Sequence, residues 1–469
     1  MENSKLVALL RTFSNSEWRR FLDLVSSPFF NTRPELLKLA EYLELRSPSL
    51  AGPELDKEAI FVELYPDEPF DNKQMGYLMN YLLRLGEQFL GLERLINDSL
   101  VLTFQTMTAL RERELDKHFH FLLNRGLKEL DKHFPESSEK YQYCFQLLRL
   151  KSEESTRQGD LKQDIIRGEA RSALDAYHVL ETLKLGCERH RYQSISSAHN
   201  GLVNLSWIEQ YLVEGSEAPP LVAMYRSLYL SLTTEDAEKA LRDLLGLIRA
   251  HAEHVDRGEL EVLFQYATEH CVHLLRQGNR SFAAIALEFF QEGLRNEIFM
   301  EQGEIQPDTL LGIVDLYLGM NDPSGASGFV REYKGFLPPA GKDQVVDLAS
   351  SMVDFQTGQY GRAVDRLTEN DFRDLRFFVR AMILRIKVHY ATQNLDRLLS
   401  DLAELTLFVR KDKTLDPDYR KEVNEFCAFL HQVLRRNPKK RAVLQQQIEE
   451  NEAVREREWL LKVLEQEVH

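Results

Sequence analysis

The sequence predicts an all-α protein in which an N-terminal helical domain precedes an irregular array of helix pairs. Apolar residues recur at steps of three and four in every strongly periodic segment, and no segment alternates over any length as a strand would. The chain has 469 residues, too many for one compact helical core. We expect an N-terminal domain over 1–95, a helical connecting region over 96–215, a repeat region over 216–436 and a C-terminal helix over 437–469.

The first amphipathic helix is predicted from its capping residues. Ser14 and Glu17 have the spacing of a capping box, in which each side chain accepts a hydrogen bond from the other residue's backbone. The helix should stop before Pro28, because a proline disfavours helix in the residue before it, and the next should begin at Pro34. We expect Phe29 and Phe30, in the loop between them, to pack back on the core.

Two more helices complete the expected N-terminal domain. A short helix carries Ile60, Phe61 and Leu64 and ends at Tyr65. A longer helix begins near Asn72, and its apolar residues follow the period of one buried face. These residues are Met75, Leu78, Met79, Leu82, Leu85 and Phe89.

The connecting region should be helical, with breaks at 134–138 and around Gly159. Ser137 and Lys140 have the spacing of a nucleophile motif, but the position after Pro135 favours Ser137 as a helix cap. The stretch 215–220 contains Gly215, Pro219 and Pro220 and is the clearest linker in the sequence.

Beyond the linker, the sequence shows a recurring pattern of a glycine, a small residue and a leucine. Gly358, Ala363 and Leu367 have the same spacing as Gly278, Ala283 and Leu287, and residues 390–397 match residues 355–362 at an offset of 35. Glycine permits a tight turn between helices, and alanine lets two helices approach closely.

This pattern resembles the tetratricopeptide repeat, whose period is 34 residues. The resemblance covers about 260–410 and implies stacked helix pairs that expose an inner groove to partner proteins. Arg280 replaces the aromatic residue of the motif, Gln393 replaces the glycine, and 321–325 carries an insertion, so the array should be irregular. The two ends of the chain, at 27–31 and 455–461, resemble uncharacterised helical proteins from Bacteroidetes genomes, which implies no activity.

The net charge excludes several classes of partner, and the cysteines indicate the cell compartment. The net charge is −15, which repels nucleic acid and anionic lipid, and no stretch is apolar enough to cross a membrane. The basic run at 435–441 is interpreted as a helix end followed by a helix start. The start of the chain lacks a signal-peptide core. The four cysteines are scattered, which fits thiols in a reducing compartment, so we expect a cytoplasmic protein.

No catalytic, cofactor or metal motif is recognised. His251 with His254 and His270 with His273 could each present two rings from a helix, but the helix rise would separate the two pairs by about 12 Å, too far for one zinc ion. Three carboxylates in the loop at 67–71 lack calcium-loop spacing and are expected to cap the following helix. We therefore expect no enzyme activity, no cofactor and no metal.

One helix stands out as a binding candidate. Arg373, Arg376, Arg380 and Lys387 fall within an arc of about 60° on the helix predicted from about Phe372 to Tyr390, and no acidic residue shares that arc. The cations should point away from the core. They would suit an acidic segment or a C-terminal carboxylate of a partner protein. The alternative is a solvated face paired with carboxylates of a neighbouring helix.

The C-terminal segment from Pro438 to Val468 is predicted as one helix held at its two ends, with Trp459 as the main contact. The function predicted for the whole chain is a non-enzymatic scaffold or adaptor that binds another protein. Two alternatives stay open: a helical enzyme or small-ligand receptor whose site is spread along the sequence, and a DNA-associated regulator.

Overall fold

The computed structural model describes residues 1–97, 99–159, 163–193, 218–370, 372, 374–412, 414–435, 441–451 and 454–466. Within these ranges the chain is α-helical, and the only strands are the antiparallel hairpin β1 (Met300–Glu301) and β2 (Glu304–Ile305). The all-α prediction is confirmed. Among the described helices, none combines the length and the apolar character needed to cross a membrane. The chain divides into unit 1, residues 1–133 with 146–166, and unit 2, residues 134–145 with 167–469.

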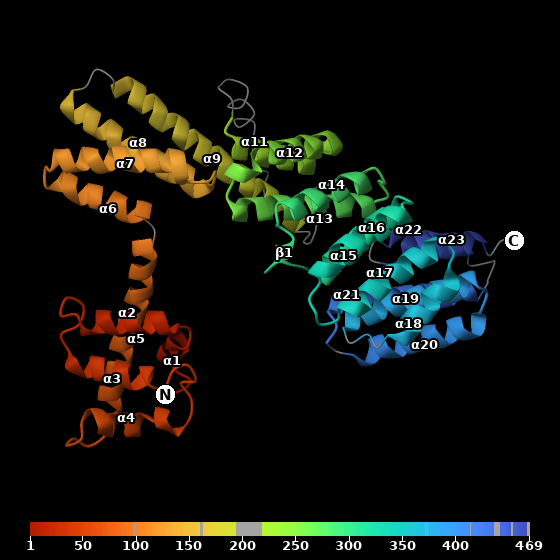
Figure 1. The fold of residues 1–469 in the computed structure, drawn as a ribbon, viewed down its shortest axis with the longest axis horizontal. Coiled ribbons are helices and arrows are strands. Elements are labelled where there is room, and N and C mark those ends of the chain that lie inside the picture. The colour runs from red at the N-terminus through yellow and green to blue at the C-terminus, as the bar shows by residue number, and fades with distance from the viewer. Residues whose placement is uncertain are drawn as a thin grey trace. The chain divides into compact units, whose positions relative to one another are not determined.

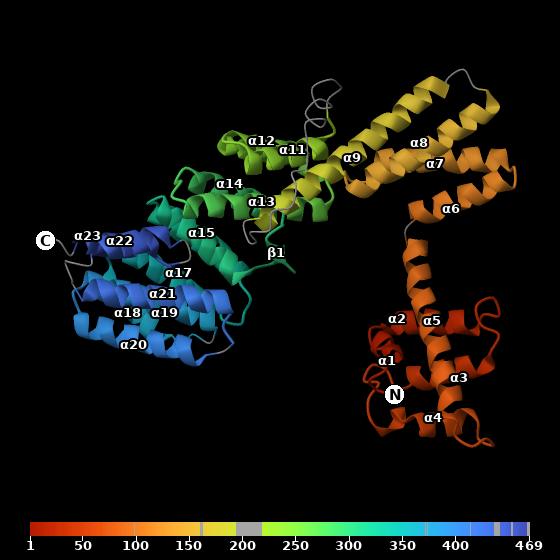
Figure 2. The same ribbon diagram turned by 180° about the vertical axis from the view of Figure 1, so that it is seen from behind.

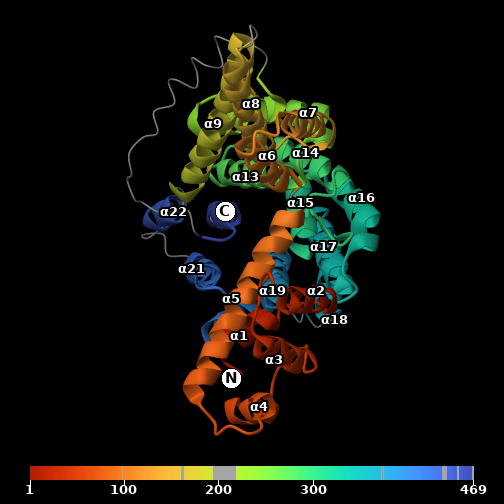
Figure 3. The same cartoon turned by 90° about the vertical axis from the view of Figure 1, so that its left-hand side faces the viewer.

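Unit 1 begins with four helices that pack along a longer fifth one (Figure 3). They are α1 (Lys5–Leu10), α2 (Asn15–Ser26), α3 (Pro34–Glu44), α4 (Lys57–Leu64) and α5 (Asn72–Asn97), with the 3-10 turn η1 (Pro53–Leu55) before α4. The predicted capping box of Ser14 and Glu17 is present at the start of α2. Of the three loop carboxylates expected to cap α5, Asp71 accepts hydrogen bonds from the amides of Lys73 and Gln74.

The core of these five helices closes around aromatic side chains. Trp18 and Phe21 of α2 pack edge to face at 6.0 Å between ring centroids, and Phe21 also contacts Phe89 of α5. The expectation for Phe29 and Phe30 is wrong. The Phe29 side chain is 87% exposed, and Phe30 is also exposed, because the turn at 27–31 folds on its own backbone hydrogen bonds and directs both rings outward.

Unit 1 also contains α6 (Ser99–Glu112), α7 (Asp116–His133) and the second half of α8 (Ser138–Gln158). Arg111 of α6 forms an ion pair with Glu153 of α8 at 2.6 Å. The predicted breaks at 134–138 and at Gly159 separate α7 from α8 and end α8. Ser137 accepts a hydrogen bond from the Lys140 amide at 3.1 Å, which confirms its interpretation as a helix cap.

Unit 2 is built mainly from antiparallel helix pairs that pack one against the next (Figure 1). Most of α9 (Gln163–Gln193) belongs to this unit and precedes the pairs. The pairs are α11 (Pro220–Thr233) with α12 (Ala237–His251), α13 (Arg257–Arg276) with α14 (Phe282–Arg295), α15 (Pro307–Gly319) with α16 (Pro323–Tyr333), α17 (Lys342–Gln356) with α18 (Tyr360–Glu369), and α19 (Leu375–Ala391) with α20 (Leu395–Lys411). The 3-10 turns η2 (Ala252–His254) and η3 (Lys334–Phe336) follow α12 and α16. Most of the predicted linker at 215–220 lies outside the described residues.

Four of these pairs share one turn geometry. The turn residue has a positive φ in each: 94° at Gly278, 60° at Asn321, 76° at Gly358 and 56° at Gln393. In all four, its amide donates to the carbonyl oxygen three residues back, and the next amide donates to the carbonyl oxygen five residues back. This is the pattern that closes a helix with a left-handed residue. The sequence pattern predicted the turns at Gly278, Gly358 and Gln393. It did not predict the fourth turn, at Asn321.

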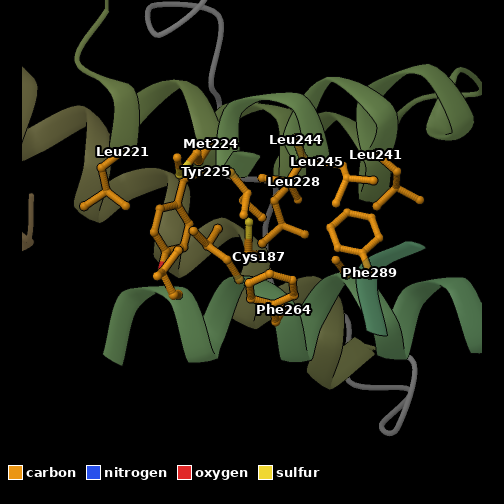
Figure 4. Close-up of a cluster of buried hydrophobic side chains, with 14 of the residues drawn as sticks. Cys187, Leu221, Met224, Tyr225, Leu228, Leu241, Leu244, Leu245, Phe264 and Phe289 are labelled. Carbon is orange, nitrogen blue, oxygen red and sulfur yellow. The ribbon is translucent and has the colours of Figure 1, made fainter. Parts of the chain in front are cut away.

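The cores of the pairs follow one another as three clusters of buried side chains. Figure 4 shows the first, in which Tyr225 and Leu228 of α11 and Leu245 of α12 lie with Phe264 of α13 and Cys187 of α9. Cys187, Cys271 and Cys427 are buried thiols, and Cys144 is partly buried. Ala363 and Leu367, which the repeat pattern singled out, are both buried.

The C-terminal segment differs from its prediction. It forms two helices, α22 (Arg441–Glu450) and α23 (Arg457–Gln466), which pack against each other and against α21 (Pro417–Leu434) (Figure 2). The polar stretch after Ile448 contains a turn that includes Glu456, at a φ of 58°. This turn lets Ile448 and Leu460, at the two apolar ends, enter the same core cluster.

Candidate functional site

A cavity of about 680 Å³ lies inside unit 2. Its walls come from α15, α17, α19 and α23, together with the turn between α13 and α14. Three of these helices, α15, α17 and α19, are the first members of their pairs. Apolar side chains line part of the wall: Leu348, Met352, Phe355, Ile383, Leu384 and Trp459.

The charged side chains of the cavity carry an excess of cations. Five are basic, namely Arg280, Arg380, Lys387, Arg455 and Lys462, and three are acidic, namely Asp315, Glu456 and Glu458. The whole chain, by contrast, has a net charge of −15. The cavity is therefore a local concentration of positive charge in an acidic protein, and such a site attracts anions.

Two ion pairs occupy the wall formed by α19. Arg380 Nη2 lies 2.5 Å from Asp315 Oδ2, and Lys387 Nζ lies 2.9 Å from Glu456 Oε2. The cations are the better covered partners, with side chains 18% and 17% exposed, whereas Asp315 and Glu456 are 55% and 32% exposed. The basic groups are thus covered by the wall, and the two carboxylates face the open space of the cavity.

The two carboxyl groups respond differently to this setting. Loss of hydration between the cavity walls raises the pKa of Asp315, and the attraction of Arg380 offsets only part of that effect. Burial also opposes ionisation of Glu456. Here the charges of Lys387, Arg455 and Arg380 outweigh it and lower the pKa.

Aromatic rings surround Lys387. Its ammonium lies 5.3 Å from the ring centroid of Phe355 and 6.0 Å from that of Trp459, within the range of cation–π attraction. Trp459 is held in turn by Tyr390, at 5.6 Å between centroids, and by Phe426. Lys387 therefore has aromatic surface beside its charge.

The structure brings together part of the cationic set predicted from sequence. Arg380 and Lys387 line the cavity, and Arg373 lies outside the described residues. Arg376 does not line the cavity and pairs with Asp308 at 2.5 Å and with Asp374 at 3.3 Å. The expectation that the cations point away from the core is wrong for Arg380 and Lys387, because α19 is packed by neighbours on nearly all sides. Every described member of the set has a carboxylate partner, as the alternative interpretation expected, but Arg380 and Lys387 are 18% and 17% exposed and do not form the solvated face of that interpretation.

The acidic side chains of the site were not predicted from the sequence. Asp315 and Glu456 lie 65 and 69 residues from their partners along the chain. Neither stands in a motif, and no periodicity links them to α19. Only the fold places them there.

A second polar cluster lies between α8, α9, α11 and α13 of unit 2. The buried Glu259 carboxylate accepts hydrogen bonds from Tyr225 Oη at 2.6 Å and from Lys184 Nζ at 2.8 Å. Lys184 Nζ also lies 3.0 Å from Ser138 Oγ, the arrangement of a serine–lysine pair. Burial alone would lower the pKa of Lys184, but Glu259 and Glu181 raise it overall. At neutral pH Lys184 is therefore an ammonium that donates to Ser138 and cannot take its proton.

Two of the four histidines considered as zinc ligands have other contacts. His270 Nε2 lies 2.9 Å from the Ser231 carbonyl oxygen and donates to it, and His273 lies 3.0 Å from the Gln277 side chain. Across the part of the chain that the structure describes, no three His, Cys, Asp or Glu side chains gather as a metal site.

In comparisons with known proteins, no family model, curated protein or solved structure matches the chain.

Proposed function

We propose that this chain is a protein-interaction module without enzymatic activity, and that its pairs α13–α20 form an irregular tetratricopeptide-like array. The four shared turns support this arrangement, since they recur at intervals of 43, 37 and 35 residues, at Gly278, Asn321, Gly358 and Gln393. Stacked helix pairs of this kind use the inner surface formed by the first helices to bind other proteins. The cavity lies on α15, α17 and α19, the first helices of three pairs.

The observation that carries the proposal is the cationic, partly aromatic cavity in an otherwise acidic chain. Arg380 and Lys387 can each donate hydrogen bonds to a carboxylate, and such charge-assisted bonds are stronger than neutral ones. Trp459 and Phe355 add apolar surface beside them. An acidic segment or a C-terminal carboxylate of a partner protein fits this combination.

The test is affinity capture from the cells that produce the protein, with partners identified by mass spectrometry. The variant Arg280→Glu with Lys462→Glu reverses two charges of the cavity at exposed positions. The control, Arg226→Glu with Lys239→Glu, makes the same change at exposed positions of α11 and α12 outside the cavity. The cavity variant should lose partners that the control retains. Identical partners for both variants would remove the cavity from the binding site.

A small acidic molecule is the second candidate ligand, because α23 covers one side of the cavity and its volume lies within the usual range for small-molecule sites, about 300–1,000 Å³. A thermal-shift panel of carboxylic and phosphorylated metabolites separates the two. A rise in melting temperature with one compound, absent in the cavity variant, would favour a small-ligand receptor over a scaffold.

A further inference from the structure

The following inference rests on the proposed function and specifies the ligand. We infer that the cavity receives an extended segment of a partner protein with two acidic residues three positions apart and an apolar residue between them, and that Asp315 and Glu456 compete with this segment for Arg380 and Lys387.

The spacing of the two cations sets the spacing of the acids. Arg380 and Lys387 are seven residues apart on α19, which places them on the same face with a rise of about 10.5 Å between them. In a polyproline II segment, residues i and i+3 point the same way and are about 9.3 Å apart. A β-strand does not match, because side chains on one face are about 6.6 Å or 13.2 Å apart.

A helix could also present two acids about 10.5 Å apart, at positions i and i+7. Such a helix is about 10 Å wide with its side chains, whereas an extended segment is a single chain wide. Because α23 covers one side of the cavity, the narrower segment is the occupant that we propose.

The wall between the two cations is apolar. Ile383 and Leu384 lie between them on α19, and Met352 and Phe355 of α17 line the same cavity. Trp459 of α23 also contributes to the lining. A residue between the two acids would therefore meet apolar side chains, and an apolar residue gains most from that contact.

The chain's own carboxylates can leave the cations without unfolding any helix. Asp315 and Glu456 lie on the side of the cavity and are more exposed than their partners, so rotation of their side chains releases Arg380 and Lys387. Helix α23 would stay in place, because Leu460, Val463 and Leu464 hold it in the core.

Charge complementarity supports a ligand with two acids. The lining has five basic and three acidic side chains, and Arg455 also pairs with Glu422, outside the lining, at 3.6 Å. A ligand that takes Arg380 and Lys387 from Asp315 and Glu456 needs one carboxylate for each of these two cations. Asp315 and Glu456 would then reduce affinity, because they must give up their pairs before the ligand can form its own.

The probe is a fluorescein-labelled peptide with Asp-Leu-Ala-Asp between Gly-Ser flanks, and binding to the full chain is measured by fluorescence anisotropy. Comparison peptides carry Asn in place of both acids, acids two positions apart, or acids at i and i+7 of a helix-forming sequence. The protein variants are Asp315→Asn with Glu456→Gln, and Arg380→Gln with Lys387→Gln. A control, Glu235→Gln with Asp243→Asn, removes two negative charges from exposed positions outside the cavity.

We expect the Asp315→Asn, Glu456→Gln variant to bind the probe about threefold more tightly or better, as the loss of two partly exposed ion pairs allows. The control should bind like the wild type, and the Arg380→Gln, Lys387→Gln variant should lose binding. Circular dichroism confirms that each variant is folded.

The outcomes separate the two proposals. Equal or weaker binding by the Asp315→Asn, Glu456→Gln variant, or tighter binding of the helical or two-spaced peptide, overturns the inference. The proposed function survives either result if partner capture still depends on the cavity cations. If no acidic peptide binds to any variant and partner capture ignores the cavity, both proposals fail.

Discussion

Alanine at Gly358 and at Gly361 should change stability in opposite directions, although the two glycines are three residues apart. Gly358 has a φ of 76°, and no atom lies within 4 Å of the position that a Cβ would take. The substitution therefore changes only backbone conformation there. A side chain in the left-handed region lowers the free energy of unfolding by roughly 1–2 kcal/mol. Alanine also restricts the unfolded chain, which raises that free energy by about 0.4–1 kcal/mol. The expected net loss is up to about 1.6 kcal/mol.

Gly361 lies within α18, is exposed, and has equally open space around the added Cβ. Gly361 is the second residue of this helix, so alanine is favoured over glycine by up to about 0.5–1 kcal/mol, the value for a helix interior. Gly361→Ala should therefore stabilise the protein.

Urea unfolding followed by far-UV circular dichroism measures both changes, and the two variants should differ by up to about 2.6 kcal/mol, with Gly361→Ala the more stable. The comparison is internal, since both sites belong to the same turn and helix. Gly358→Ala as stable as Gly361→Ala would refute the left-handed turn that the helix pairs share.

Four further predictions follow from the fold. Gln393→Gly should raise the melting temperature by relieving a φ of 56°, a gain of about 0.5–1 kcal/mol, and a lower melting temperature would contradict the turn assignment. Burial and the neighbouring Glu259 raise the pKa of Tyr225 above its ordinary value of 10.0. The contribution of Tyr225 to stability should therefore be full below pH 10.0 and decrease as the pH rises further. Tyr225→Phe should weaken this pH dependence in urea titrations at pH 8, 9.5 and 11. Leu460→Ala should cost about 2–5 kcal/mol and expose the C-terminal segment to trypsin, and unchanged resistance would show that α23 is held elsewhere. Phe29→Ala should change stability by no more than about 0.5 kcal/mol, because its ring is exposed; a larger loss by urea titration would mean that the ring packs on the core.

Local chemistry explains what could be predicted from the sequence. The capping box at Ser14, the helix start at Pro34 and the turn at Gly358 depend on residues within one helical turn of each other. The buried face of α5 follows from periodicity alone. Phe29 shows the limit of such reasoning, since hydrophobicity predicts burial only where the backbone directs the side chain inward.

The candidate site could be predicted only in part, for a physical reason. Arg380 and Lys387 share a helix face, so a single helix reveals them. Their partners come from α15 and from the turn before α23, and the C-terminal segment reaches the cavity only because it folds as two helices. The burial of both cations depends on that distant packing, and no local pattern contains it.

The C-terminal segment contacts the turn between α13 and α14, and this contact limits how the number of helix pairs can change. Glu458 pairs with Arg280 at 3.2 Å, and Arg457 donates to the Arg276 carbonyl oxygen, across about 180 residues of sequence. An open stack of helix pairs can gain or lose a pair at little cost, because each pair contacts only its neighbours. Here an inserted or deleted pair between α14 and α21 would move α23 away from its contacts. A change in the number of pairs would therefore also change this wall of the cavity, whereas substitution and loop variation can leave it intact.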